Sequence, residues 1–256
     1  MKLSACIEWL FADASGDFAE RIRLAKASGF DAVEFWHWSN KDLDAIEAAL
    51  RETGLSLTGF VAEPMIALTD PANHAAFLEG LSASLAQAQR LGATVLIAQA
   101  GDDLPGRSRE EQHDALVACL AGAAEILKGS GVRLGVEPLN TFIDHKGYYL
   151  SSTREALNIV DEVARPEIGI VHDLYHSYVM GERIEDVLRQ RVSRVVHAHV
   201  ADHPGRNDPG LGEIDLAQRL DWLFANGYSG PVGLEYKPAA ATAGAMASVR
   251  SALMPA

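Results

Sequence analysis

Four side chains that bind divalent cations or transfer protons in enzymes stand at the ends of apolar segments in the C-terminal half of the chain. They are Glu137 in VRLGVEPLN, Asp173 in EIGIVHDLYH, His199 in SRVVHAHVAD and Glu235 in GPVGLEYKP. Successive members are about 30 residues apart, which is the length of one strand–helix unit. Because a buried carboxylate is costly unless it is paired, four such endings indicate one shared site.

The donor types of these four residues predict a divalent metal ion. Three carboxylates and one imidazole that converge where water is scarce repel one another unless a cation lies among them. Hard oxygen donors with a single nitrogen suit Mg²⁺ or Mn²⁺, with Co²⁺ as a further option. The two cysteines, Cys6 and Cys119, lack the CxxC spacing of a thiolate site. We therefore predict that all four side chains are ligands of one divalent cation.

The elements that must position these residues alternate along the whole chain between short apolar segments and helical patterns. The expected strands are 3–7, 32–36, 55–61, 94–99, 132–137, 168–173, 195–199 and 232–236. The expected helices are 18–28, 41–53, 71–91, 109–128, 156–163, 182–190, 215–226 and 240–253. Nothing in the chain reads as a linker between domains.

Eight successive strand–helix units predict an α/β fold, a single (β/α)8 TIM barrel over residues 1–256. Strands separated by helices pair in parallel, and repeated right-handed crossovers close into a barrel. The competing architecture is an open doubly wound sheet, which carries a glycine-rich phosphate loop after its first strand. IEWLFADASGDF contains no such loop. We favour the barrel, in which the site lies at the C-terminal ends of the strands.

Side-chain alternation places three glycines beneath the predicted ligands. Gly135, Gly169 and Gly233 precede them by two or four residues and therefore face the barrel axis. The same alternation places His197 under His199. We expect a sparsely filled layer in which His197 hydrogen-bonds a ligand carboxylate and supports it from behind.

Charge and composition argue against several classes of protein. The 256 residues include 22 Lys plus Arg and 35 Asp plus Glu, and the net charge of −13 would repel nucleic acid. No stretch approaches the roughly 18 uninterrupted apolar residues of a membrane span, and polar residues interrupt the N-terminus where a signal peptide has its core. We expect a cytoplasmic protein with a small-molecule partner and no nucleic acid or membrane partner; homo-oligomer formation is left open.

Five motifs closely resemble those of the hydroxypyruvate isomerases, a family of the xylose isomerase-like barrel superfamily. They are EPLN at 137–140, HDLYH at 172–176, HAHVAD at 197–202, PGRNDPGLGEID at 204–215 and GLEYKP at 233–238. The resemblance implies that the four residues described above bind a divalent metal. It also implies that Glu137 and Glu235 are the acid/base pair, and that His176 and Arg206 hold substrate oxygens.

The resemblance implies an intramolecular oxidoreductase that interconverts an aldose and a ketose, within carbohydrate and glyoxylate metabolism. The proton would move between adjacent carbons through an enediolate, with Glu137 and Glu235 as acid and base. Arg206 suits a carboxylate, so we expect a short oxo- or hydroxy-acid, first of all hydroxypyruvate converted to tartronate semialdehyde. Lys237 either pairs with Glu235 or contacts this substrate, and we group it with the substrate-binding residues.

Other functions are compatible with the same predicted site. A 2-oxo-tetronate isomerase or a ketose 3-epimerase would use the same four ligands on a different substrate. A metal nuclease like the apurinic endonucleases, which share this barrel, is a remote alternative that the net charge disfavours. A non-catalytic sugar-binding barrel is a further remote alternative.

Aromatic and acidic residues also stand near the ends of strands in the N-terminal half. Trp36, His37 and Trp38 follow the second expected strand and either pack the top of the barrel or wall the substrate pocket. Three glutamates near other strand ends are expected to form structural pairs: Glu8, Glu34 and Glu63.

Overall fold

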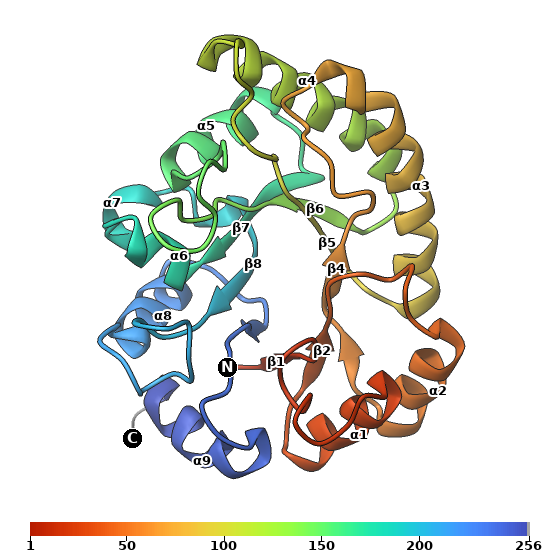
Figure 1. Ribbon diagram of the computed structural model, residues 1–256, viewed down its shortest axis with the longest axis vertical. Helices are drawn as coiled ribbons and strands as arrows, with labels where there is room; N and C mark the ends of the chain where they lie inside the picture. Colours follow the sequence, from red (N-terminus) through yellow and green to blue (C-terminus); the bar gives the residue numbers. More distant parts are fainter. Residues whose placement is uncertain (255–256) are drawn as a thin grey trace.

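The computed structural model describes residues 1–254, and it confirms the predicted TIM barrel: parallel strands surround a central axis and helices cover the outside (Figure 1). The strands are β1 Leu3–Cys6, β2 Ala32–Glu34, β3 Ser56–Leu57, β4 Gly59–Val61, β5 Val95–Ala98, β6 Arg133–Val136, β7 Ile168–Asp173, β8 Val195–Val200 and β9 Val232–Leu234. The helices are α1 Phe18–Ala27, α2 Leu43–Thr53, α3 His74–Leu91, α4 Arg109–Leu127, α5 Thr153–Val163, α6 Leu174–Val179, α7 Ile184–Val187, α8 Leu216–Ala225 and α9 Thr242–Leu253.

The barrel closes through Thr58. The order of paired strands is β3-β2-β1-β9-β8-β7-β6-β5-β4, so its two ends are the two halves of the predicted third strand. The Thr58 N–H donates to the Val33 carbonyl at 2.9 Å, and the Thr58 carbonyl accepts from Val95 N–H at 3.2 Å. Residues 55–61 thus pair with one neighbour in their first half and with the other neighbour in their second half.

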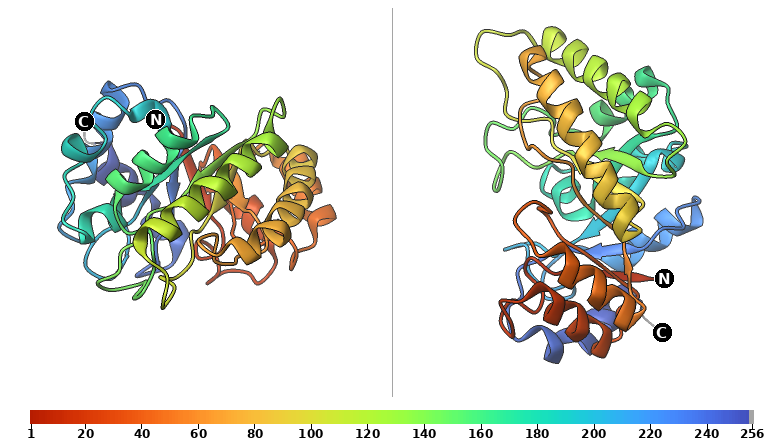
Figure 2. Two further views of the ribbon diagram at one scale, coloured as in Figure 1. Left: turned by 90° about the horizontal axis from the view of Figure 1, so that it is seen from above. Right: turned by 90° about the vertical axis from the view of Figure 1, so that its right-hand side faces the viewer.

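The helices pack side by side around the strands, with α1 on α2, α3 on α4, α4 on α5 and α8 on α9 (Figure 2). Most predicted helices are present at nearly the predicted bounds. The helix predicted over 182–190 is wrong in extent, since α7 covers four residues there and Arg189 adopts a positive φ of 45°. No helix within residues 1–254 is long and apolar enough to cross a membrane.

Helix α6 was not predicted, and its cause is Asp173. The carboxylate of this residue accepts hydrogen bonds from the main-chain N–H groups of Tyr175 and His176, which is the N-cap arrangement. Six residues are too few to show a helical period in the sequence. Asp173 therefore ends β7 and begins α6 at the same position.

The layer beneath the site is filled by valines, so the expectation of a sparse layer is wrong. A Cβ on Gly135 would lie 2.6 Å from Val196 Cγ2 and 2.8 Å from Val171 Cγ2. The strand register shifts between Ile170 and Val171, and the second of these packs inside the barrel with Val61, Val95 and Ile97. The glycines make room for branched side chains from β7 and β8.

We predict that Gly135→Ala lowers the free energy of unfolding by about 1–3 kcal/mol, because the added methyl overpacks the barrel interior. Urea denaturation of the mutant and wild-type proteins measures the change. Gly16→Ala is the control, since a Cβ at that exposed position meets no atom within 4 Å. Equal stability of Gly135→Ala and wild type would contradict this account of the layer.

Candidate active site

The four predicted ligands converge at the C-terminal end of the barrel. Glu137 follows β6, Asp173 ends β7, His199 lies in β8 and Glu235 follows β9. One donor atom of each lies within 4.8 Å of the others, and all four residues are buried. Neighbouring parallel strands end at one rim, which is why residues so far apart in the chain meet here.

The donor set fits a divalent cation. His199 Nδ1 lies 3.3 Å from Glu137 Oε1 and 3.5 Å from Glu235 Oε2. Asp173 Oδ1 caps α6, whereas the buried Oδ2 accepts no hydrogen bond from the described part of the chain. A buried carboxylate oxygen without a donor, beside two more carboxylates and an imidazole, suits an octahedral Mg²⁺ or Mn²⁺ better than a thiolate-type zinc site.

Burial and crowding change the acidity of these groups. Burial raises the pKa of Glu137 to about 7; His199 opposes this rise, while Glu235 and Asp173 add to it. Burial alone would lower the pKa of His199, but the carboxylates of Glu235 and Glu34 raise it well above its usual value. Without a metal, a proton on His199 therefore supplies part of the positive charge that the carboxylates require.

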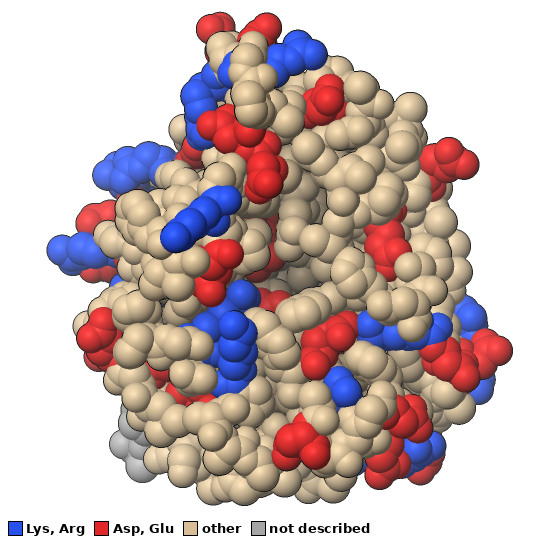
Figure 3. All heavy atoms as spheres, in the orientation of Figure 1, with Lys and Arg blue, Asp and Glu red and all other residues tan. Residues whose placement is uncertain are grey.

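The same residues form the floor of a cavity of about 430 Å³. Figure 3 shows this face of the molecule hollowed near its centre, with acidic atoms inside the hollow and basic side chains to one side. The remaining wall is largely aromatic and apolar and includes Trp9, Trp36, His37, Val61, Met65, Ile97, Gln99, Leu139, His145 and Arg206. Such a mixed wall can exclude water around a small polar ligand.

The structure separates the roles of the three residues after β2. Trp36 and His37 lie on the cavity wall, and Trp36 Nε1 donates to Glu235 Oε1 at 2.7 Å. Trp38 instead donates to Ser84 Oγ at 3.0 Å and packs against the core between strands and helices. The first two therefore belong to the pocket and the third to the packing of the barrel.

Arg206 is a buried cation on the cavity wall. Its guanidinium donates to Glu235 Oε2 and lies 3.5 Å from Asp173 Oδ2. The rings of Trp9 and Tyr175 lie 5.0 and 5.6 Å from its Cζ, so the group is held between aromatic faces. Its Nε has no hydrogen-bond partner among residues 1–254, which leaves one N–H for a ligand.

The other two predicted substrate residues lie outside the cavity wall. His176 Nδ1 accepts hydrogen bonds from the main chain and the side chain of Asn140, so its Nε2 carries the proton, 3.6 Å from Asp173 Oδ2. His145 packs against the His176 ring at 5.3 Å and forms part of the wall instead. Lys237 is exposed, with its Nζ 5.6 Å from the ring centre of Trp9.

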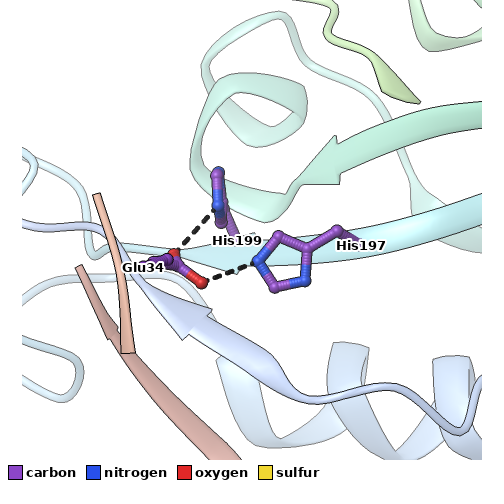
Figure 4. A group of neighbouring side chains, drawn as sticks. All are labelled: Glu34, His197 and His199. Carbon is purple, nitrogen blue, oxygen red and sulfur yellow. Dashed lines mark hydrogen bonds and ion pairs between the residues drawn. The ribbon is translucent and has the colours of Figure 1, made fainter. Parts of the chain in front are cut away.

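His197 bonds a buried carboxylate, but that of Glu34 rather than one of the four predicted ligands (Figure 4). Glu34 also lies 3.1 Å from His199 Nε2, so its assignment to a purely structural pair missed a contact with the site. Its position at the end of β2 was the available signal. Glu8 and Glu63 do form structural pairs, with Lys41 and with the main-chain N–H groups after Trp36.

Comparisons with known proteins agree on one family. The family described as xylose isomerase-like TIM barrel matches residues 22–252. Hydroxypyruvate isomerase of Escherichia coli is 30% identical over 94% of this chain and 95% of its own, and 2-oxo-tetronate isomerase of Cupriavidus necator is 28% identical over 88% and 89%. A crystal structure titled AP endonuclease, family 2, from Brucella melitensis superposes with a TM-score of 0.89 at 28% identity, covering 96% of this chain and 97% of that one.

We predict that Glu137→Gln stabilises the metal-free protein at pH 8 but not at pH 5. The folded-state pKa of about 7 exceeds the ordinary 4.5, so the wild type loses stability as pH rises from 4.5 through 7, and the neutral amide avoids that loss. In thermal unfolding with a chelator, the melting temperature at pH 8 should rise by about 2–4 °C.

Glu79→Gln serves as the control for this measurement, because Glu79 is exposed on α3. It should leave the melting temperature unchanged at both pH values. An equal effect of Glu137→Gln at pH 5 and pH 8 would show that the carboxyl does not titrate in this window.

Proposed function

The chain is an isomerase of the hydroxypyruvate isomerase family, within the xylose isomerase-like TIM barrels, and we propose that it interconverts hydroxypyruvate and tartronate semialdehyde. The observation that carries the proposal is the convergence of Glu137, Asp173, His199 and Glu235 on a cavity that Arg206 also lines. This site offers metal ligands, a proton acceptor and a carboxylate-binding cation in one place.

The four converging side chains would hold a divalent cation, and we propose Mg²⁺ or Mn²⁺, with Co²⁺ as a third option. The unpartnered Asp173 Oδ2 and the single imidazole support this assignment. Bound there, the cation would supply positive charge for the oxygens of the enediolate that forms during the reaction.

Glu137 and Glu235 are proposed to move the proton. One carboxylate takes it from the hydroxyl-bearing carbon C3, and a proton returns to C2 while the hydroxyl proton passes from O3 to O2. No oxidant or reductant is consumed, because carbonyl and hydroxyl only exchange carbons. A pKa of about 7 at Glu137 suits a group that accepts and returns a proton near neutrality. Trp36 and Arg206 each hold one oxygen of Glu235, which fixes the orientation of its carboxylate.

Arg206 would bind the substrate carboxylate. Its Nε is buried without a partner in the described chain and lies on the same wall as the two glutamates. An arginine held between two aromatic rings presents its N–H groups in a fixed direction, so it can anchor a planar carboxylate. This cation favours an oxo-acid over a neutral ketose.

The second candidate substrate is 2-oxo-tetronate. A second hollow of about 400 Å³ adjoins the cavity and shares Met65, Gln99 and His145 with it. One additional hydroxymethyl carbon could extend in that direction, toward polar groups of Gln99 and His145. A relative named 2-oxo-tetronate isomerase supports this choice.

We expect proton exchange into hydroxypyruvate or 2-oxo-tetronate in D₂O when Mg²⁺ is present, with loss of activity in a chelator and recovery when Mg²⁺ is restored. ¹H NMR of a panel of short 2-oxo acids and free ketohexoses measures exchange and product together. Preferred turnover of ketohexoses would indicate a 3-epimerase instead. Unchanged spectra for every compound would indicate a non-catalytic binder.

Glu235→Gln should reduce kcat by about 10²–10⁴-fold, because the amide cannot exchange the substrate proton. Metal content is measured on the same samples, so that loss of the cation is distinguished from loss of the acid/base group. Tyr236→Phe is the neighbouring control, since the Tyr236 hydroxyl has no hydrogen-bond partner among residues 1–254. Full activity of Glu235→Gln would refute the assignment of this residue.

A further inference from the structure

We propose that Glu34 is a positioning residue for His199: it crosses the barrel interior to hold the ring nitrogen that faces away from the other three ligands. The proposal rests on the proposed function in one respect, because it takes His199 to be a metal ligand. Glu34 belongs to none of the five motifs that carry the family resemblance, and it stands on the second strand rather than on the four that carry the ligands.

The geometry links three buried side chains in a row (Figure 4). Glu34 Oε1 lies 3.1 Å from His199 Nε2, and Glu34 Oε2 lies 3.0 Å from His197 Nε2. The exposed fractions are 4% for Glu34, 1% for His197 and 2% for His199. Each oxygen of the carboxylate therefore faces a different imidazole, and water has almost no access to any of them.

The barrel makes room for this row at Gly233. Strands β2 and β8 are separated by β1 and β9 in the sheet order, so Glu34 must reach across the interior. A Cβ on Gly233 would lie 2.3 Å from Glu34 Oε1, 2.6 Å from His199 Cδ2 and 2.8 Å from His197 Nε2. Any side chain at this position would displace the row, so its glycine is a steric requirement of the contact.

The consequence is a defined orientation of the ligand ring. When Nε2 faces Glu34, Nδ1 faces Glu137 and Glu235, at 3.3 and 3.5 Å. A carboxylate that accepts the N–H of one imidazole nitrogen leaves the lone pair on the other nitrogen, which is the nitrogen that binds a metal. Glu34 thus selects Nδ1 as the ligand atom, and His197 holds Glu34 in place.

The test uses Mn²⁺ affinity, measured by competition with a chelator, in addition to turnover. Glu34→Gln has nearly the same shape but presents either an amide N–H or a neutral oxygen to His199. We expect Mn²⁺ affinity to fall about 10–100-fold and kcat to fall with little change in KM. Glu63→Gln is the matched control, a strand-end glutamate whose partners are the main-chain N–H groups of Trp38 and Ser39.

A double-mutant cycle tests the part played by His197. If His197 acts through Glu34, His197→Asn lowers Mn²⁺ affinity by itself, and the double variant with Glu34→Gln loses little more than Glu34→Gln alone. Fully additive losses would overturn that link. Should Glu34→Gln fail to fold, His197→Asn alone carries the expected decrease, and its absence would overturn the proposal.

The outcomes separate this inference from the proposed function. Turnover by the wild type, with Mn²⁺ affinity of Glu34→Gln equal to that of Glu63→Gln, would overturn the role of Glu34 and leave the function standing. Weaker Mn²⁺ binding by Glu34→Gln in a protein that isomerises no acid would support the role of Glu34 and refute the function. Two Mn²⁺ ions per wild-type chain, one of them lost in Glu34→Gln, would make Glu34 a ligand and overturn its positioning role.

Discussion

The structure depends on how it accommodates several carboxylates buried together at one end of the barrel. Glu34, Glu137, Asp173 and Glu235 are each nearly inaccessible to water, and their mutual repulsion would be costly without nearby positive charge. His199 and Arg206 supply part of that charge, and the donor set suits a divalent cation that would supply more. The cost is tolerated because the surrounding barrel is rigid and has a large apolar core.

The barrel provides this rigidity by the way its strands end. Parallel strands bring their carboxyl ends to one rim, so each of β6, β7, β8 and β9 delivers one charged or polar side chain to the same place. Valines below the rim form a dry floor, and aromatic side chains form the walls above it. Electrostatic interactions are strong in such surroundings, which is what proton transfer from a carbon acid requires.

Several residues serve the fold and the site together. Asp173 caps α6 with one oxygen and offers the other to the site. Trp36 extends the cavity wall and holds Glu235 through its indole N–H. Gly233 is part of β9 and also leaves the space through which Glu34 reaches His199. A substitution at any of these positions would change stability and the geometry of the site at the same time.

The sequence by itself determined the barrel class and the four residues that converge. Strand and helix periods are local properties, and the rule that parallel strands end at one rim converts four strand ends into a site without coordinates. Only the tertiary structure decided that closure runs through Thr58, that Val171 and Val196 fill the glycine layer, and that Glu34 contacts His199. These contacts cross the barrel or depend on the shift of register at Ile170, so no period along the chain records them. The same reason explains why His145 was not identified on the cavity wall, since its place is set by the long connection after β6 packing against His176.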